Sequence, residues 1–128
     1  MTIFYADDDP EEIELFCFAL KEIDPGIKCV TANNGEEALA VLGREEKPSV
    51  IFLDLNMPLC NGEEVLRELK RNSKLKNVPV IIYSSVTDDN VVKELLRLGA
   101  FKFLPKTNSL KALTTSLASI FQETFYPH

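Results

Sequence analysis

Five short apolar segments recur along the chain, each separated from the next by a longer segment with helical spacing. They are residues 3–6, 27–30, 50–53, 80–83 and 101–104, rich in β-branched and aromatic side chains. Segments of this length and composition are typical of β-strands. The first, third and fourth are apolar almost throughout, which indicates strands covered on both faces, whereas the second and fifth each contain a lysine and fit flanking positions.

The segments between these strands begin with helix-capping patterns. Asn34 and Asn61 are each followed, three residues later, by a glutamate, and Asp9 precedes Pro10 in a similar arrangement. Two further helices are predicted to begin near residues 87–89 and 108–109, the last reaching about residue 122. Five strands alternating with five helices through right-handed crossovers predict an α/β fold, a flavodoxin-like doubly wound parallel sheet of strand order 2-1-3-4-5.

Length and charge narrow the classes of function. The 128 residues fit one domain, with an expected core of residues 2–122 and a short tail of 123–128. A net charge of -6 opposes direct nucleic-acid binding, and no apolar run approaches the ~20 residues that a bilayer requires. We therefore expect a cytoplasmic protein with its three cysteines reduced. The single histidine, His128, is the last residue, which argues against histidine-based catalysis.

Acidic residues follow two of the predicted strands. Asp7, Asp8 and Asp9 come directly after the first strand, and Asp54 comes directly after the third. In the predicted strand order, the carboxyl ends of these two strands flank the crevice where ligands bind. Crowded carboxylates repel one another unless they share a cation, and an oxygen-only site suits Mg²⁺. The sequence therefore predicts a divalent-metal site, although helix capping is sufficient to explain Asp9.

Two polar side chains lie at the ends of the fourth and fifth predicted strands. Ser84 ends the fourth strand with a hydroxyl, and Lys106 follows the fifth with an ammonium group. Alone, a serine at a strand end is usually a turn residue and a lysine is usually a solvated charge. Together with the aspartates, they predict phosphoryl chemistry on Asp54, because a carboxylate can attack phosphorus when cations offset the charge.

This constellation resembles the receiver domains of two-component response regulators, especially single-domain receivers of the chemotaxis type. The resemblance covers residues 2–122 and includes Asp54-Leu55-Asn56-Met57-Pro58, Asn61-Gly62 and Gly99-Ala100. It implies a phosphoacceptor that is not an enzyme in its own right and that receives a phosphoryl group from a histidine kinase or histidine phosphotransfer protein. Output would pass through the face formed by the fourth helix, fifth strand and fifth helix to an unknown downstream protein, a homodimer or a relay.

The resemblance also implies a role for each site residue. Asp54 would be the phosphoacceptor. The Mg²⁺ ligands would be Asp8 directly, Asp7 largely through water, Asp54, and the backbone carbonyl of Asn56. Ser84 and Lys106 would contact the phosphoryl group, and the rotamer of Phe103 would follow the movement of Ser84. Plain core packing is an alternative explanation of Phe103.

One departure from the family pattern leaves alternatives open. Receivers usually have proline after the lysine, joined by a cis bond, whereas Thr107 follows Lys106 here. A cis bond to a non-proline residue costs ~2.5–4 kcal/mol, so either the bond is strained or the loop is trans and places Lys106 differently. A degenerate receiver that binds partners without phosphotransfer is therefore a second hypothesis.

Two rivals from other classes fit the sequence less well. A phosphatase of the haloacid dehalogenase type needs an acidic residue where Asn56 stands. A flavodoxin-like FMN carrier needs a phosphate-binding loop after the first strand, where the three consecutive aspartates would repel phosphate.

Overall fold

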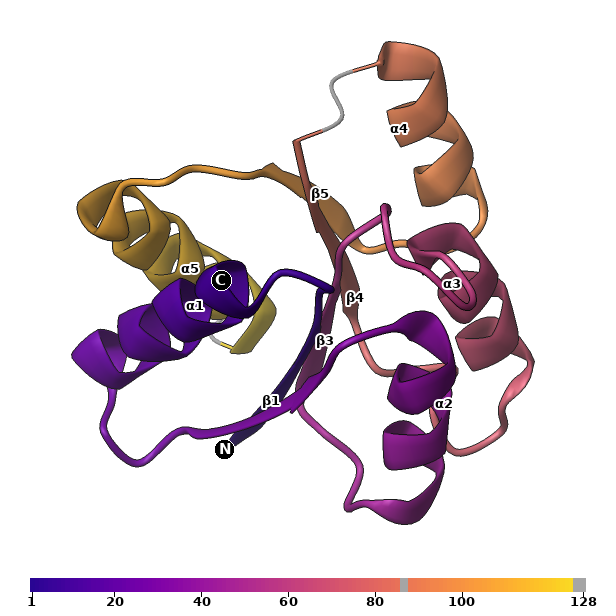
Figure 1. Cartoon of the computed structure of the whole chain (residues 1–128), viewed down its shortest axis with the longest axis horizontal. Helices are drawn as coiled ribbons and strands as arrows, with labels where there is room; N and C mark the ends of the chain where they lie inside the picture. The colour runs from indigo at the N-terminus through magenta and orange to yellow at the C-terminus, as the bar shows by residue number, and fades with distance from the viewer. Residues whose placement is uncertain (86–87, 126–128) are drawn as a thin grey trace.

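The computed structural model describes residues 1–85 and 88–125. Strands and helices alternate along the chain, as Figure 1 shows. The strands are β1 (Thr2–Ala6), β2 (Lys28–Ala32), β3 (Val50–Leu53), β4 (Val80–Ser84) and β5 (Lys102–Pro105). The helices are α1 (Pro10–Ile23), α2 (Gly35–Arg44), α3 (Gly62–Arg71), α4 (Asp89–Arg97) and α5 (Leu110–Phe125). The sheet is parallel with the order β2-β1-β3-β4-β5, so the predicted fold is confirmed.

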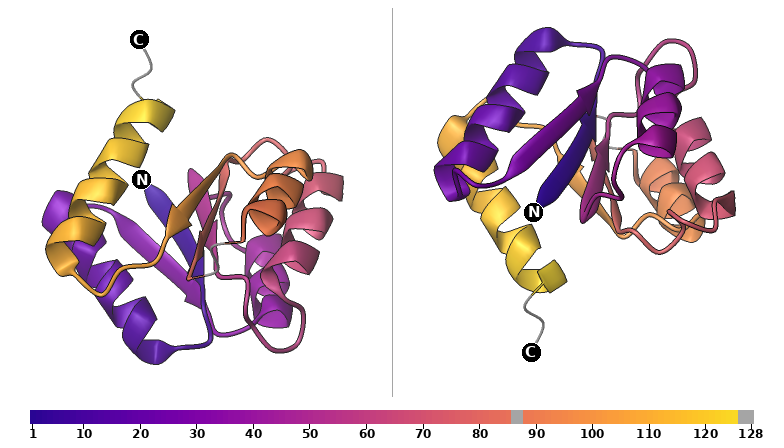
Figure 2. Two further views of the ribbon diagram at one scale, coloured as in Figure 1. Left: turned by 90° about the horizontal axis from the view of Figure 1, so that it is seen from above. Right: turned by 90° about the horizontal axis from the view of Figure 1, so that it is seen from below.

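Helices cover both faces of this sheet. Figures 1 and 2 show α1 and α5 side by side on one face and α2, α3 and α4 on the other. Residues 3–6 of β1 are all apolar, and their side chains divide between the two faces: Ile3 and Tyr5 join the core beneath α1 and α5, while Phe4 and Ala6 join the other core. A strand covered on both sides therefore needs no polar alternation.

The edge strands are β2 and β5, as their lysines predicted. Element boundaries differ from the sequence prediction by up to three residues. β2 and β5 each begin one residue later than expected, and α5 continues to Phe125 instead of ending near Gln122. The expected helix start at Thr87 and the final tail residues 126–128 lie outside the described residues.

Side chains cap the helices that the sequence marked. The Asn34 side chain accepts a hydrogen bond from the Glu37 amide at 2.8 Å, and that of Asp9 accepts one from the Glu11 amide at 2.9 Å. In α3 the cap is reciprocal, because Asn61 accepts from the Glu64 amide while the Glu64 carboxylate accepts from the Asn61 amide, both at 3.0 Å. These caps fix where α1, α2 and α3 leave the carboxyl edge of the sheet.

Candidate functional site

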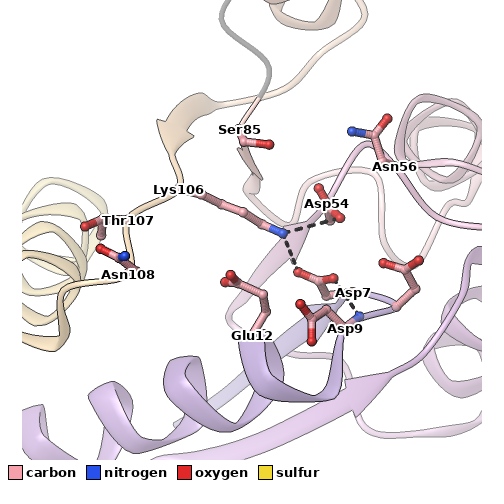
Figure 3. Close-up of a pocket in the computed structure, with 10 residues that line it drawn as sticks. Asp7, Asp9, Glu12, Asp54, Asn56, Ser85, Lys106, Thr107 and Asn108 are labelled. Atoms are coloured by element: carbon pink, nitrogen blue, oxygen red, sulfur yellow. Dashed lines mark hydrogen bonds and ion pairs between the residues drawn. The ribbon is translucent and has the colours of Figure 1, made fainter.

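A cleft of about 380 Å³ opens beyond the carboxyl ends of β1, β3, β4 and β5 (Figure 3). This is the edge of the sheet where strand order reverses and where ligands bind in doubly wound folds. The lining residues are mostly acidic or polar: Asp7, Asp8, Asp9, Glu12, Asp54, Asn56, Ser85, Lys106, Thr107 and Asn108.

Three aspartates converge in this cleft. Asp7, Asp8 and Asp54 each place one carboxylate oxygen within 4.8 Å of the others. Asp7 and Asp54 are buried, whereas Asp8 is exposed at the mouth of the cleft. An all-oxygen set with one side open to solvent suits a hard divalent cation that keeps part of its water shell. The convergence predicted from the sequence is therefore present in the structure.

Lys106 supplies the positive charge at this site. Its ammonium lies 2.7 Å from Asp7 Oδ2 and 3.4 Å from an Asp54 carboxylate oxygen, although 99 positions separate it from Asp7. Burial alone would lower the pKa of Lys106, but the hydrogen bond to Asp7 and the charges of Asp54, Asp7 and Glu12 outweigh burial and raise it. Lys106 therefore stays protonated between the two carboxylates.

Asp7 is held by three donors. Its Oδ2 accepts hydrogen bonds from both Lys106 and the Tyr5 hydroxyl, and its Oδ1 accepts one from the Asp9 amide at 3.0 Å. Burial, followed by the hydrogen bond to Asp7, raises the pKa of Tyr5, so this hydroxyl remains a donor. The Tyr5 ring packs against Phe16, with 4.2 Å between ring centroids. The orientation of Asp7 is thus fixed from within the core.

The electrostatic environment of Asp54 favours its neutral form. Burial, and then the nearby charge of Asp7, raise the pKa of Asp54 to about 6, while Lys106 and the Asn56 backbone amide oppose the rise. A metal-free Asp54 is therefore partly protonated near pH 6, and a bound cation would favour the ionised form.

The remaining predicted residues lie at different depths. Asn56 is exposed at the rim of the cleft. Ser84 is fully buried at the end of β4, and the neighbouring Ser85 is the serine that lines the cleft. Phe103 is partly buried, packs against the core beneath α2, α3 and α4, and is not among the residues that line the cleft. No cis peptide bond occurs in the described residues, so the Lys106–Thr107 bond is trans.

The loop after Asp54 packs tightly against its surroundings. A Cβ atom on Gly62 would lie 2.4 Å from the Asp54 carbonyl oxygen, so only glycine fits there. Leu59 and Cys60 both have positive φ angles, 52° and 87°, and the Leu59 carbonyl accepts a hydrogen bond from the Glu36 amide at 2.8 Å. The strained turn therefore anchors this loop to the start of α2.

Sequence reasoning missed several residues of the site. Tyr5 lies two residues before Asp7, and Glu12 lies one helical turn after Asp8. A hydroxyl two positions before a strand-end acid, and an acid on the first turn of the next helix, are signals that could have marked them. Thr107 and Asn108 gave no comparable signal, because only the path of the loop after β5 brings them to the cleft.

Residues 3–118 match the response regulator receiver domain family. The chain belongs to this family. It is a two-component receiver domain, which makes it a signalling phosphoacceptor, and its cleft is an acidic metal-binding pocket. Receiver domains of two-component systems act with histidine kinases.

Individual relatives agree with this assignment. The chain is 37% identical over 108 residues to a protein-glutamate methylesterase/protein-glutamine glutaminase from Clostridium acetobutylicum, covering 83% of this chain and 30% of that protein. It is 29% identical over 123 residues to a phosphate regulon transcriptional regulatory protein from Pseudomonas aeruginosa, covering 96% of this chain and 52% of that protein. The receiver domain thus spans about half or less of these two relatives.

Solved structures resemble it over nearly the whole chain. The phosphorylated cyanobacterial phytochrome response regulator RcpA matches with a TM-score of 0.88 at 28% identity, covering 99% of this chain and 95% of that chain. The Mn²⁺-bound form of the response regulator Rcp1 matches with a TM-score of 0.83 at 28% identity, covering 94% and 91% respectively. In the described part of the receiver domain, no helix is long and apolar enough to cross a membrane.

Proposed function

We propose that residues 1–128 form a single receiver domain that accepts a phosphoryl group on Asp54 in a Mg²⁺-dependent reaction. One observation carries the proposal: the buried Asp54 carboxylate lies 3.4 Å from the Lys106 ammonium, and its metal-ligating oxygen lies within 4.8 Å of those of Asp7 and Asp8. No other group of three or more potential metal ligands occurs in residues 1–85 and 88–125.

The donor set fits Mg²⁺. Asp8 and Asp54 have carboxylate oxygens available, and the Asn56 carbonyl would complete the direct ligands. Because Asp7 already accepts three hydrogen bonds, it would contribute largely through water, as the family resemblance implied. When bound, a divalent cation would offset negative charge on the incoming phosphoryl oxygens.

The chain's own residues would carry the chemistry. An ionised Asp54 oxygen attacks the phosphorus of a partner's phosphohistidine, a new P–O bond forms, the P–N bond breaks, and the released imidazole takes a proton from solvent. The Lys106 ammonium, now paired with Asp7 and Asp54, offsets charge on the transferred group. Later attack by water on the acyl phosphate returns inorganic phosphate and free Asp54.

The same proposal covers the signalling step. Ser84, buried at the end of β4, would turn to bond the phosphoryl group, and the partly buried Phe103 would follow this movement. Phe103 lies within β5 and Ser84 pairs with Pro105 of β5, so both adjoin the face formed by α4, β5 and α5. In the cytoplasm, a histidine kinase or histidine phosphotransfer protein would supply the phosphoryl group to this protein, and this face would bind a downstream protein or a second copy of the chain.

Intact mass spectrometry tests the proposal directly. The protein is incubated with acetyl phosphate and Mg²⁺, and wild type is compared with Asp54→Asn and with the exposed Asp89→Asn as a matched control. We expect wild type and Asp89→Asn to gain one phosphoryl mass and Asp54→Asn to gain none, and EDTA should prevent the gain. An equal gain in Asp54→Asn would point to another acceptor, and no gain in wild type would favour a receiver that only binds partners.

A further inference from the structure

Glu12 is an acidic residue of the cleft that none of the predicted roles includes. It lies in the first turn of α1, three residues after the N-cap Asp9. Figure 3 shows its carboxylate below Lys106 and beside Asp7, on the side of the cleft away from Asn56. Its Oε2 atom is buried and has no hydrogen-bond partner among the described residues.

Helix capping does not explain this carboxylate. Asp9 and Glu12 have the same spacing as Asn61 and Glu64, which form a reciprocal cap at the start of α3. In α3 the Glu64 carboxylate accepts a hydrogen bond from the Asn61 amide at 3.0 Å. In α1 the corresponding Asp9 amide donates instead to Asp7 Oδ1 at 3.0 Å, so Glu12 has no cap donor to accept from and turns towards the cleft.

The surroundings of Glu12 are unfavourable to a carboxylate in the metal-free protein. Burial raises the pKa of Glu12, Lys106 opposes the rise, and the charges of Asp7 and Asp9 add to it. Because Oε2 is buried from water, any hydrogen bond from the cleft must reach the part of the Glu12 carboxylate that lines it. Waters retained by a divalent cation would be donors there, because Mg²⁺ usually keeps several of them.

We infer that Glu12 is a positioning residue of the cation site, whose carboxylate, on the side that lines the cleft, accepts a hydrogen bond from a water that the cation retains. This inference rests on the proposed Mg²⁺ site of Asp7, Asp8 and Asp54 and adds a fourth carboxylate that acts without touching the ion. Such outer partners orient the ligands and the water shell of a metal, and their loss typically weakens metal affinity or activity 10–100-fold.

Calorimetric titration with Mg²⁺ provides the test. The variants are Glu12→Gln, which keeps the shape and removes the charge, and Glu14→Gln, which makes the same change at an exposed position of the same helix outside the cleft. We expect Glu12→Gln to weaken Mg²⁺ affinity about tenfold, at the low end of the usual range because an amide oxygen still accepts weakly. Glu14→Gln should remain within about twofold of wild type, since surface charge is screened by salt.

Thermal unfolding in EDTA separates this role from a structural one. Because no described residue donates a hydrogen bond to the Glu12 carboxylate, Glu12→Gln should leave the melting temperature unchanged or raise it, whereas loss of a structural carboxylate would lower it. Two results would overturn this inference and leave the proposed function standing. One is a Glu12→Gln variant that binds Mg²⁺ as tightly as wild type does, and the other is a lowered melting temperature of this variant that accounts for its weaker binding. If wild type and Asp8→Asn bind Mg²⁺ equally weakly, the proposed function fails together with the inference.

Discussion

The charge on Asp54 should destabilise the metal-free protein at neutral pH. Asp54 is 4% exposed, and burial together with Asp7 raises its pKa from 3.8 to about 6 despite the nearby Lys106. A carboxyl whose pKa is higher in the folded state contributes stability that is fully present below about pH 4. That stability is lost as the pH rises through about 6. At 1.36 kcal/mol per pH unit, a shift of about two units corresponds to roughly 3 kcal/mol.

Asp54→Asn should recover much of this free energy, because asparagine has the same shape and no charge. Since the substitution also removes a partner of Lys106, we expect the metal-free variant to be more stable than wild type by roughly 1–3 kcal/mol at pH 7.5. At pH 4.5 the wild-type carboxyl is mostly protonated, so the difference should fall below about 1 kcal/mol. Urea unfolding in EDTA at both pH values measures the two differences.

Asp89→Asn is a matched control for which we expect the opposite change in the free energy of unfolding. Asp89 is exposed in the first turn of α4, where a negative charge stabilises the helix, so Asp89→Asn should lose roughly 0.3–1 kcal/mol. Equal or lower stability of Asp54→Asn at pH 7.5, or a gain that persists unchanged at pH 4.5, would refute the reasoning. Either result would mean that Lys106 fully compensates the Asp54 charge in the fold.

Three further outcomes follow from the geometry of the site. Mg²⁺ affinity, measured by calorimetry, should fall as the pH is lowered through about 6, because Asp54 must be ionised to bind a cation. Lys106→Met should lower the free energy of unfolding in EDTA by about 3 kcal/mol, since Asp7 and Asp54 lose the ammonium between them. Urea titration would measure this loss, and added Mg²⁺ should restore part of it. Gly62→Ala should destabilise the protein by more than about 2 kcal/mol in the same assay, because the added Cβ would lie 2.4 Å from the Asp54 carbonyl oxygen. Gly43→Ala is the control: its Cβ would meet nothing within 4 Å, so this substitution should stabilise α2 by up to about 1 kcal/mol.

Local patterns predicted the fold well because the signals they use are local. Strand composition, lysines on the second and fifth strands, and the asparagine caps of α2 and α3 depend on residues a few positions apart. The same patterns were less informative at α1. Asp9 does cap this helix, but Glu12 does not return the bond as Glu64 does in α3, because Asp7 already takes the Asp9 amide. Which carboxylate accepts from the Asp9 amide depends on how the chain passes from β1 to α1 in three dimensions, and local patterns do not specify this path.

Two neighbouring serines illustrate a second limit. The sequence drew attention to Ser84 as the hydroxyl at the end of the fourth strand, yet Ser84 is buried and Ser85 lines the cleft. Ser84 is still within β4, whose residues are all buried, whereas Ser85 lies one residue beyond the strand, at the edge of the sheet where the cleft opens. The strand boundary, which sequence patterns predict only within a few residues, decides which serine reaches the cleft in this structure.

Local patterns were sufficient to predict the order of strands and helices, the reversal of strand order, and the presence of Asp7, Asp8 and Asp54 at the carboxyl edge, because apolar periodicity and caps specify where each strand ends. How those charges are compensated depends on contacts between residues far apart in the chain. Lys106 meets Asp7 across 99 positions of sequence, and Tyr5 donates to the same carboxylate from the core. The pKa of Asp54 depends on these distances and on burial, and both arise when the crossovers pack the helices against the sheet.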